Sequence, residues 1–135
     1  MISARFGPAR RVPGVLLLAL AALLAAGCTR PPVTGNVGGK VVYRGSAVTE
    51  GEVHFYAKET GTGGIARIDR DGNYRFDTPL RTGVYAVYVR PTPPEPGSPA
   101  PSASNIPTKY RDMTTSGLSC TVNEGENDYP VVMSD

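Results

Sequence analysis

Cysteine and histidine are the side chains most often used as nucleophile and base, and the sequence has three of them: Cys28, His54 and Cys120. Nucleophilic catalysis also needs a third group that orients the base. Cys120 alternates with Leu118 and Val122 in "LSCTV", and a free cysteine on such an apolar face is commonly a small buried hydrophobe. The chain has no HExxH, CxxC or GxSxG motif. We therefore predict no enzymatic activity and no cofactor.

Oxygen-bearing side chains cluster at Asp69, Asp71 and Asn73, which could bind calcium or close a turn. A 12-residue calcium loop needs further ligands and a bidentate glutamate, whereas Arg70 lies inside this segment. Asp71 and the glycine after it form a pair that tolerates positive φ in hairpin turns. Turn chemistry is the favoured interpretation, so no metal site is predicted.

Two tyrosines are candidate ligand-binding residues. "EVHFYA" and "VYAVYV" alternate in a two-residue period, which places Tyr56 and Tyr88 on the side opposite to Phe55 and Val87. If the two strands are neighbours, the rings form a platform for a sugar or a protein partner. A register shifted by one residue would instead bury both rings.

These strands follow an apolar segment. Arg5, Arg10 and Arg11 precede "VLLLALAALLAAG" (15–27), which has no polar or charged side chain. Basic residues, a short apolar run and small residues before a defined point are the three parts of a secretory signal. The run is shorter than the roughly 20 residues that a transmembrane helix needs, and a buried core helix is the alternative. Residues 1–27 are therefore predicted to be a signal peptide.

"LAAGC" (24–28) resembles the lipobox of bacterial lipoproteins, in which small residues precede a cysteine. The resemblance implies that the Cys28 thiol receives a diacylglyceryl group and that cleavage leaves Cys28 first in the mature protein. Two acyl chains are sufficient for stable membrane attachment. Residues 28–35 are then the lipidated cysteine and a tether, and Cys120 has no disulfide partner. The protein is therefore predicted to be anchored to a membrane and exposed to the periplasm or at the cell surface.

Charge excludes one class of partner. Three of the 14 basic residues precede Cys28, and all 12 acidic residues follow it. Residues 28–135 therefore lack the clustered basic face that nucleic-acid binding requires. Their number suits one small domain.

The 16 glycines and 13 prolines of the chain leave little room for helices. Two-residue alternation bounded by turn residues predicts an all-β domain of about seven strands over residues 36–135, in a Greek-key β-sandwich. We expect a first strand at roughly 36–43, a hairpin at "IARIDRDGNYRF" and a turn at "NEGEN". The Pro-rich stretch 91–104 cannot enter a sheet interior, and is a loop or a recognised polyproline segment.

Four pieces occur in the order "GKVVYRGSAVTEGEVHFY", "IDRDGNYRF", "LRTGVYAVYV" and "IPTKYRDMTTSGLSCTVNEGEN". Together with the lipobox they resemble a lipoprotein family of planctomycete-type bacteria that has a carboxypeptidase-regulatory-like domain. The resemblance covers roughly residues 24–134. It implies a seven-stranded transthyretin-like sandwich.

We interpret the family segment "IPTKY" as structural. We expect it to cross from one sheet to the other, with Ile106 and Tyr110 packed inward, Pro107 fixing the bend and Lys109 in solvent. Tyr85 should fill one end of the sandwich while its hydroxyl bonds to the backbone, as in a tyrosine corner.

"YRGS" (43–46) is also similar to the signature of transthyretin-related hydroxyisourate hydrolases. In those enzymes the tetrapeptide closes the chain, and histidine and arginine residues meet at a tetramer interface. Here the tetrapeptide ends the first strand, and His54 is the only histidine. A hydrolase is therefore the third hypothesis. The first is a non-catalytic, lipid-anchored envelope protein that serves as a structural or interaction module of unknown partner, with an envelope protein or a glycan as candidates; the second is a carbohydrate- or ligand-binding module of the same fold.

Overall fold

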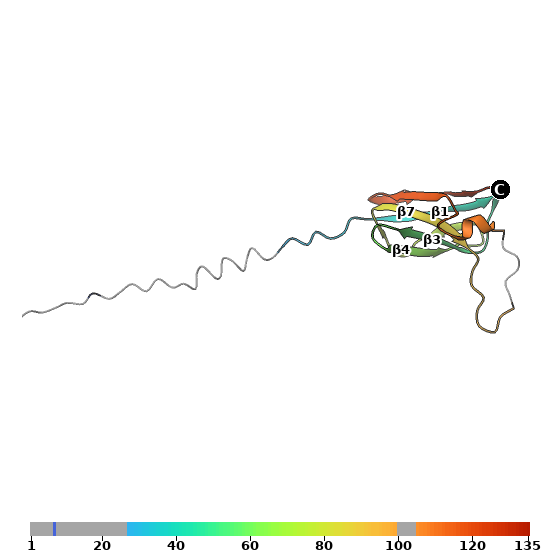
Figure 1. Cartoon of the computed structure of the whole chain (residues 1–135), viewed down its shortest axis with the longest axis horizontal. Coiled ribbons are helices and arrows are strands. Elements are labelled where there is room, and N and C mark those ends of the chain that lie inside the picture. Colours follow the sequence, from blue (N-terminus) through green and yellow to red (C-terminus); the bar gives the residue numbers. More distant parts are fainter. Residues whose placement is uncertain (1–6, 8–26, 100–104) are drawn as a thin grey trace, which may run out of the picture. The chain divides into compact units, whose positions relative to one another are not determined.

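The computed structural model describes Gly7, residues 27–99 and residues 105–135 (Figure 1). The chain divides into two units, Met1–Pro31 and Pro32–Asp135. All strands of the described residues lie in the second unit.

Two predicted segments fall wholly or partly outside the described residues. The signal peptide predicted for residues 1–27 lies outside them except for its last residue and Gly7, and so do residues 100–104 of the Pro-rich loop. In the part of the chain that the structure describes, no helix has the length and apolar character needed to cross a membrane.

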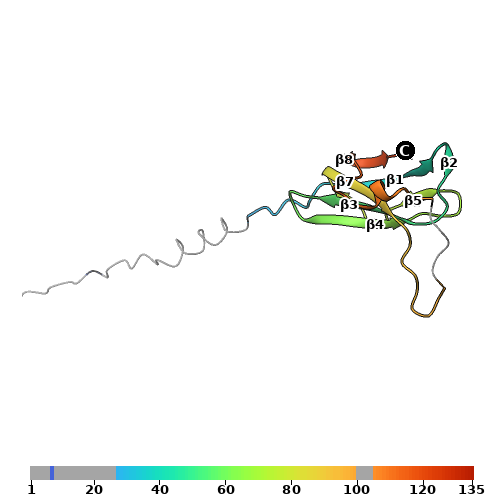
Figure 2. The ribbon, with the colours of Figure 1, turned by 45° about the vertical axis from the view of Figure 1, so that its right-hand side comes forward.

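The second unit is all-β, as predicted, with two sheets and one short 3-10 helix among its described residues (Figures 1 and 2). One sheet is antiparallel, with the strand order β4–β3–β7–β8. The six-stranded sheet is built around β1, which pairs antiparallel with β2, β5 and β6 and parallel with β9 and β10. The elements are β1 Thr34–Tyr43, β2 Ser46–Ala47, β3 Glu52–Ala57, β4 Thr62–Arg67, β5 Asn73–Arg75, β6 Leu80–Arg81, β7 Gly83–Arg90, η1 Thr108–Arg111, β8 Leu118–Val122, β9 Gly125–Asp128 and β10 Val131–Met133.

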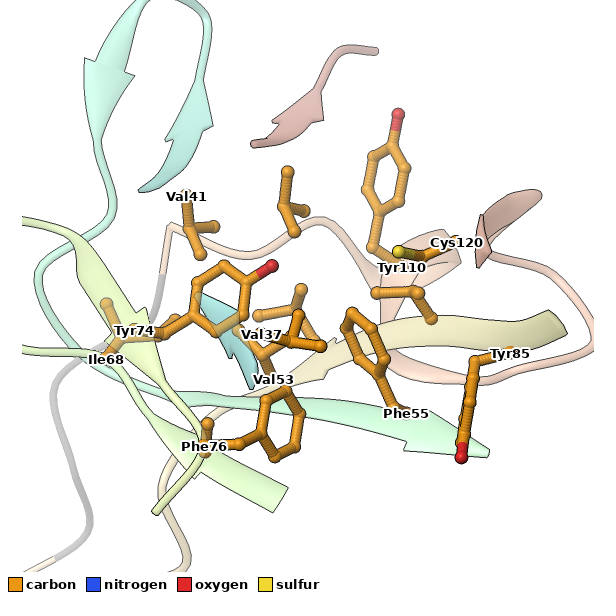
Figure 3. Close-up of a cluster of buried hydrophobic side chains, with 14 of the residues drawn as sticks. Val37, Val41, Val53, Phe55, Ile68, Tyr74, Phe76, Tyr85, Tyr110 and Cys120 are labelled. Carbon is orange, nitrogen blue, oxygen red and sulfur yellow. The ribbon is translucent and has the colours of Figure 1, made fainter. Parts of the chain in front are cut away.

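One hydrophobic core takes side chains from both sheets, because each strand turns alternate residues inward. Phe55 on β3 is 2% exposed, and its ring centroid lies 5.0 Å from that of Phe76 and 5.8 Å from that of Tyr85. Figure 3 shows these rings beside Val37 and Val53. The inward faces expected from the alternation on β3 and β7 are confirmed.

The first strand begins earlier than expected, at Thr34. Thr34 pairs with Arg81 and Gly35 pairs with Leu80. The last two residues of the predicted tether 28–35 therefore belong to the sheet. A Cβ at Gly35 would lie 2.0 Å from the carbonyl oxygen of Asn123. Glycine is therefore needed here for close packing of two backbones, at a position that was predicted to lie in the tether.

The predicted turn after Asp71 forms, but its two arms belong to different sheets. Asp69 Oδ1 accepts hydrogen bonds from the backbone N–H groups of Asp71 and Asn73, both at 2.9 Å. β4 pairs with β3 whereas β5 pairs with β1, and one bridge, Ile68 to Tyr74, joins the arms. The predicted hairpin is therefore confirmed at its turn, where Ile68 pairs with Tyr74, and is wrong for the rest of its arms. Local turn chemistry reverses the chain but does not select the strand with which each arm pairs.

The segment that contains "IPTKY" packs as predicted but connects differently. Ile106 and Tyr110 are 1% and 5% exposed, Lys109 is exposed, and Pro107 precedes η1 with φ −59°. The segment joins β7 to β8, which are neighbours in the four-stranded sheet. The predicted crossing between sheets is therefore wrong, because burial of its side chains does not tell which strand follows.

The predicted turn "NEGEN" contains a strand instead. Its last three residues and the following Asp128 form β9 (Gly125–Asp128), which runs parallel to β1. Glu126 accepts a hydrogen bond from Asn36 Nδ2 at 2.9 Å and forms an ion pair with Arg75 at 3.1 Å. Asn127 Nδ2 donates to the backbone oxygen of Asn36 at 3.1 Å. Pairing with β1 thus outweighs the turn preference of these residue types.

Candidate functional site

The outer face of the four-stranded sheet groups the aromatic side chains that the sequence singled out. In the register of the sheet, His54 on β3 lies opposite Tyr88 on β7 and opposite Ile65 on β4. Tyr56, two residues along β3, lies on the same face next to Gly63. Tyr56 and Tyr88 therefore lie on neighbouring strands, both half-buried, in the arrangement that a platform requires.

His54 is the member of this cluster that sequence reasoning did not select. Its ring stacks on Tyr88 with centroids 4.7 Å apart and an interplanar angle of 18°. The residue is only 8% exposed, because neighbours on both sides of its strand flank it. The i, i+2 spacing to Tyr56 already placed His54 on this face, but the stack depends on the register between β3 and β7.

Burial sets the electrostatics of His54. It lowers the pKa of the imidazole, and the positive charge of Arg90 adds to this shift, while the nearby Glu52 carboxylate opposes it without overcoming it. His54 Nε2 lies 3.4 Å from Glu52 Oε2, yet it is buried and makes no hydrogen bond. The ring of His54 is therefore neutral, and its Nε2 lies near Glu52, closed off from solvent.

A shallow depression of about 530 Å³ lies over this cluster. Gly63 forms part of its wall. This residue must be glycine, because a Cβ here would lie 2.1 Å from the backbone oxygen of Phe55. The depression is lined by His54, Phe55, Tyr56, Gly63, Gly64, Ile65 and Tyr88.

This arrangement suits binding better than catalysis. Aromatic rings supply stacking area, and tyrosine hydroxyls supply hydrogen bonds. Cys120 is buried in the core on the other face of the same sheet, where burial raises the pKa of its thiol. The thiol is therefore protonated and away from His54, and its predicted burial is confirmed.

A second depression of about 510 Å³ lies where β5 and β9 flank β1. Its side chains are mainly charged, and Arg75 and Glu126 pair with each other across it. Both are more than half exposed, and such pairs contribute little in water. The aromatic depression is therefore the stronger candidate site.

The remaining residues from the sequence analysis have structural partners. Tyr110 accepts a hydrogen bond at its hydroxyl from the Ser134 backbone N–H at 3.0 Å, and the Lys109 ammonium lies 4.8 Å from the Tyr110 ring centroid. Pro107 accepts the hydrogen bond that closes η1.

Cys28 is exposed. Among the described residues, no group of histidine, cysteine or carboxylate side chains is placed to hold a metal ion.

"YRGS" is a two-residue hairpin turn between β1 and β2. Tyr43 pairs with Ser46, and Arg44 and Gly45 have φ of +52° and +77°. Positive φ at both central residues is the geometry of a type I′ turn, which matches the twist of the flanking strands. This role accounts for the tetrapeptide without catalysis.

No protein-family model matches the chain, and no curated protein matches it. Among solved structures, a DUF3823 family protein from Parabacteroides merdae is 18% identical with a TM-score of 0.45, over 75% of this chain and 46% of that one. A DUF3823 family protein from Bacteroides ovatus is 17% identical with a TM-score of 0.46, over 73% and 42%. The chain thus spans less than half the length of these structures.

Proposed function

We propose that the protein is a non-catalytic, lipid-anchored module of the cell envelope that binds a partner through the outer face of its four-stranded sheet. The observation that carries the binding role is the cluster of His54, Tyr56 and Tyr88 in an open depression. The anchor rests on the basic residues, the apolar run and "LAAGC" before the strands.

Mass spectrometry of the full chain extracted from membranes tests the anchor. We expect a mature protein that begins at Cys28 and carries a diacylglyceryl thioether. The Cys28→Ser variant should be lost from the membrane fraction. The control variant Cys120→Ala, which keeps Cys28, should remain in the membrane fraction. An unmodified Cys28 in the wild type, or a retained Met1, would contradict the anchor.

The finer fold that we propose is the transthyretin-like, seven-stranded Greek-key sandwich of the carboxypeptidase-regulatory-like lipoproteins. β5 and β6 pair with successive parts of β1, and so do β9 and β10 on its other side, so each pair counts as one interrupted strand. With the two-residue β2 set aside, seven strands remain. The hydroxyl of Tyr85 donates to the Arg81 backbone oxygen at 2.9 Å, which supports a tyrosine corner.

A carbohydrate is the partner that one observation favours specifically. Sugars combine apolar C–H faces with hydroxyl groups, and the depression offers the stacked rings of His54 and Tyr88 together with the hydroxyls of Tyr56 and Tyr88. On a glycan array, Tyr56→Ala and Tyr88→Ala should each remove the signal of the wild type. Tyr43→Ala, at the distant β1–β2 turn, is the matched control and should keep it. Binding that survives both site variants would exclude this face.

The hydrolase hypothesis has a direct assay. We expect no turnover of hydroxyisourate by the purified chain. Turnover that His54→Ala abolishes would instead support an enzyme and would contradict the non-catalytic proposal.

A further inference from the structure

Arg90 is an exposed cation beside the aromatic depression. It follows Tyr88 by two residues on β7, so both side chains lie on the outer face of the four-stranded sheet. Its Cζ lies 5.1 Å from the centroid of the Tyr88 ring, and Tyr88 lines the depression. A ligand that contacts the Tyr88 ring is therefore close to a positive charge.

Two contacts hold the guanidinium of Arg90 in place. Its Nε donates a hydrogen bond to the backbone oxygen of Arg111 at 3.0 Å, and its plane is attracted to the Tyr88 ring. The terminal nitrogens Nη1 and Nη2 have no hydrogen-bond partner among the described residues. Two such N–H groups side by side form the fork that binds both oxygens of a carboxylate.

The carboxylates of the chain that lie near Arg90 have other partners. Glu52 is opposite Arg90 in the sheet register, but its Oε2 lies 3.4 Å from His54 Nε2 and its side chain is 14% exposed. Asp112 Oδ1 accepts hydrogen bonds from the Thr114 N–H at 2.8 Å and from the Thr114 hydroxyl at 2.6 Å. Within residues 27–99 and 105–135, Arg90 forms no ion pair.

The row of residues next to the aromatic cluster has a net positive charge. Arg67 on β4 and Arg90 on β7 both lie opposite Glu52 on β3. The two arginines are exposed, whereas the glutamate between them is mostly buried. Such a row attracts an anionic ligand and gives no advantage to a neutral one.

We propose that the aromatic depression binds an acidic carbohydrate, whose carboxylate is held by the two terminal nitrogens of Arg90. This inference rests on the proposed binding role of the same face and adds the chemical class of its ligand. Residues two apart on one face of a strand lie about 7 Å from each other. The carboxylate of a uronic acid is attached directly to its sugar ring, so a ring against Tyr88 has its carboxylate within reach of Arg90.

A comparison of ligands tests this proposal without any variant of the protein. Oligomers of galacturonate, glucuronate and mannuronate are each compared with their methyl esters, in which the carboxyl group is uncharged. The full chain should bind at least one of the acids about tenfold or more tightly than its ester. Equal binding of acid and ester would overturn the Arg90 site, but would leave the proposed binding face intact if Tyr56→Ala and Tyr88→Ala still abolished binding. No binding of any oligomer would overturn both this proposal and the carbohydrate partner.

Substitution of Arg90 tests the residue itself. Arg90→Gln should weaken binding of the acidic oligomer about tenfold or more and leave binding of the ester unchanged. Arg90→Lys keeps the charge but lacks the fork, so it should restore only part of the affinity. Arg75→Gln is the matched control, because it removes the same charge from the other sheet, where Arg75 pairs with Glu126. Urea unfolding checks that the three variants are folded.

Three outcomes of these measurements would contradict the assignment. An equal loss of affinity in Arg90→Gln and Arg75→Gln would mean that only the net charge of the protein matters. Tighter binding of a sulfated oligosaccharide than of the oligouronates would assign the site to a different anion. A polyglutamate peptide that binds as tightly as the oligouronates would favour an acidic protein as the partner. None of these outcomes affects the proposed lipid anchor.

Discussion

The role inferred for His54 differs between the sequence and the structure. As the only histidine in a chain with "YRGS", it was the residue on which a hydrolase would depend. In the fold it is buried between Ile65 and Tyr88, with its pKa lowered and no hydrogen bond at Nε2. These properties suit a neutral ring in a binding face.

The stability of the protein should depend on pH through His54. Its folded pKa lies below the unfolded value of about 6.5, so the unfolded state binds more protons between the two values. The contribution of His54 is therefore present above about pH 6.5 and is lost as the pH falls through the folded pKa. Urea unfolding at several pH values should show this loss in the wild type and less of it in His54→Phe, which keeps a stacked ring. Parallel losses in both proteins would contradict the prediction.

Tyr85 is the residue whose role was predicted most closely. Its hydroxyl donates to the Arg81 oxygen at 2.9 Å, as expected for a tyrosine corner. Tyr85→Phe should lower the free energy of unfolding by about 1 kcal/mol, the usual net value of such a bond. Tyr56→Phe is the control, since no hydrogen bond of the Tyr56 hydroxyl is found among the described residues, and its cost should stay below about 0.5 kcal/mol. Equal losses in the free energy of unfolding for the two variants would mean that the hydroxyl of Tyr85 does not stabilise the fold.

At the scale of elements, the turn after Asp71 was predicted correctly, whereas the pairing of the strands beside it was not. Gly72 has the positive φ that its sequence suggested, +82°, and Gly45 in the β1–β2 turn has a φ of +77°. The arms that leave the turn at Gly72 nevertheless enter different sheets. Turn geometry depends on a few adjacent residues, whereas strand pairing depends on every strand that competes for the same edge.

These two glycines separate backbone strain from steric contact. In Gly45→Ala a Cβ has no atom within 4 Å, so only the left-handed backbone should cost stability, about 1 kcal/mol. In Gly72→Ala the Cβ would lie 2.9 Å from the Cβ of Ala47, which adds about 1–2 kcal/mol of overpacking. Urea unfolding of the two variants should show the larger loss for Gly72→Ala. The reverse order would mean that the β1–β2 turn is the more constrained one.

At the scale of the whole molecule, stability depends on the aromatic centre of the core. Phe55 lies within 6.5 Å, between ring centroids, of Tyr74, Phe76, Tyr85 and Tyr129. These rings come from several strands of both sheets and from the segment between β9 and β10. The two sheets therefore share one core and should unfold together.

Phe55→Ala should cost about 3–5 kcal/mol, because it removes a large buried side chain and leaves a cavity. A domain of this size has a total stability of about 5–15 kcal/mol, so the variant should be near the limit of folding. Val84→Ala, on the outer face at 66% exposure, should stay within about 0.5 kcal/mol of the wild type. Thermal or urea unfolding measures both. A small effect of Phe55→Ala would contradict a single shared core.

The sequence alone determined the all-β class, the inward faces of β3 and β7, the positive-φ turn after Asp71 and the burial of Cys120. Each of these follows from neighbouring residues, through the two-residue period of strands or the stereochemistry of glycine. Only the tertiary structure decided that β9 pairs with β1, that "IPTKY" connects two strands of the same sheet and that His54 stacks on Tyr88. These contacts join residues far apart in the chain, where local pattern is the same for several pairings and the packing of the whole core selects one.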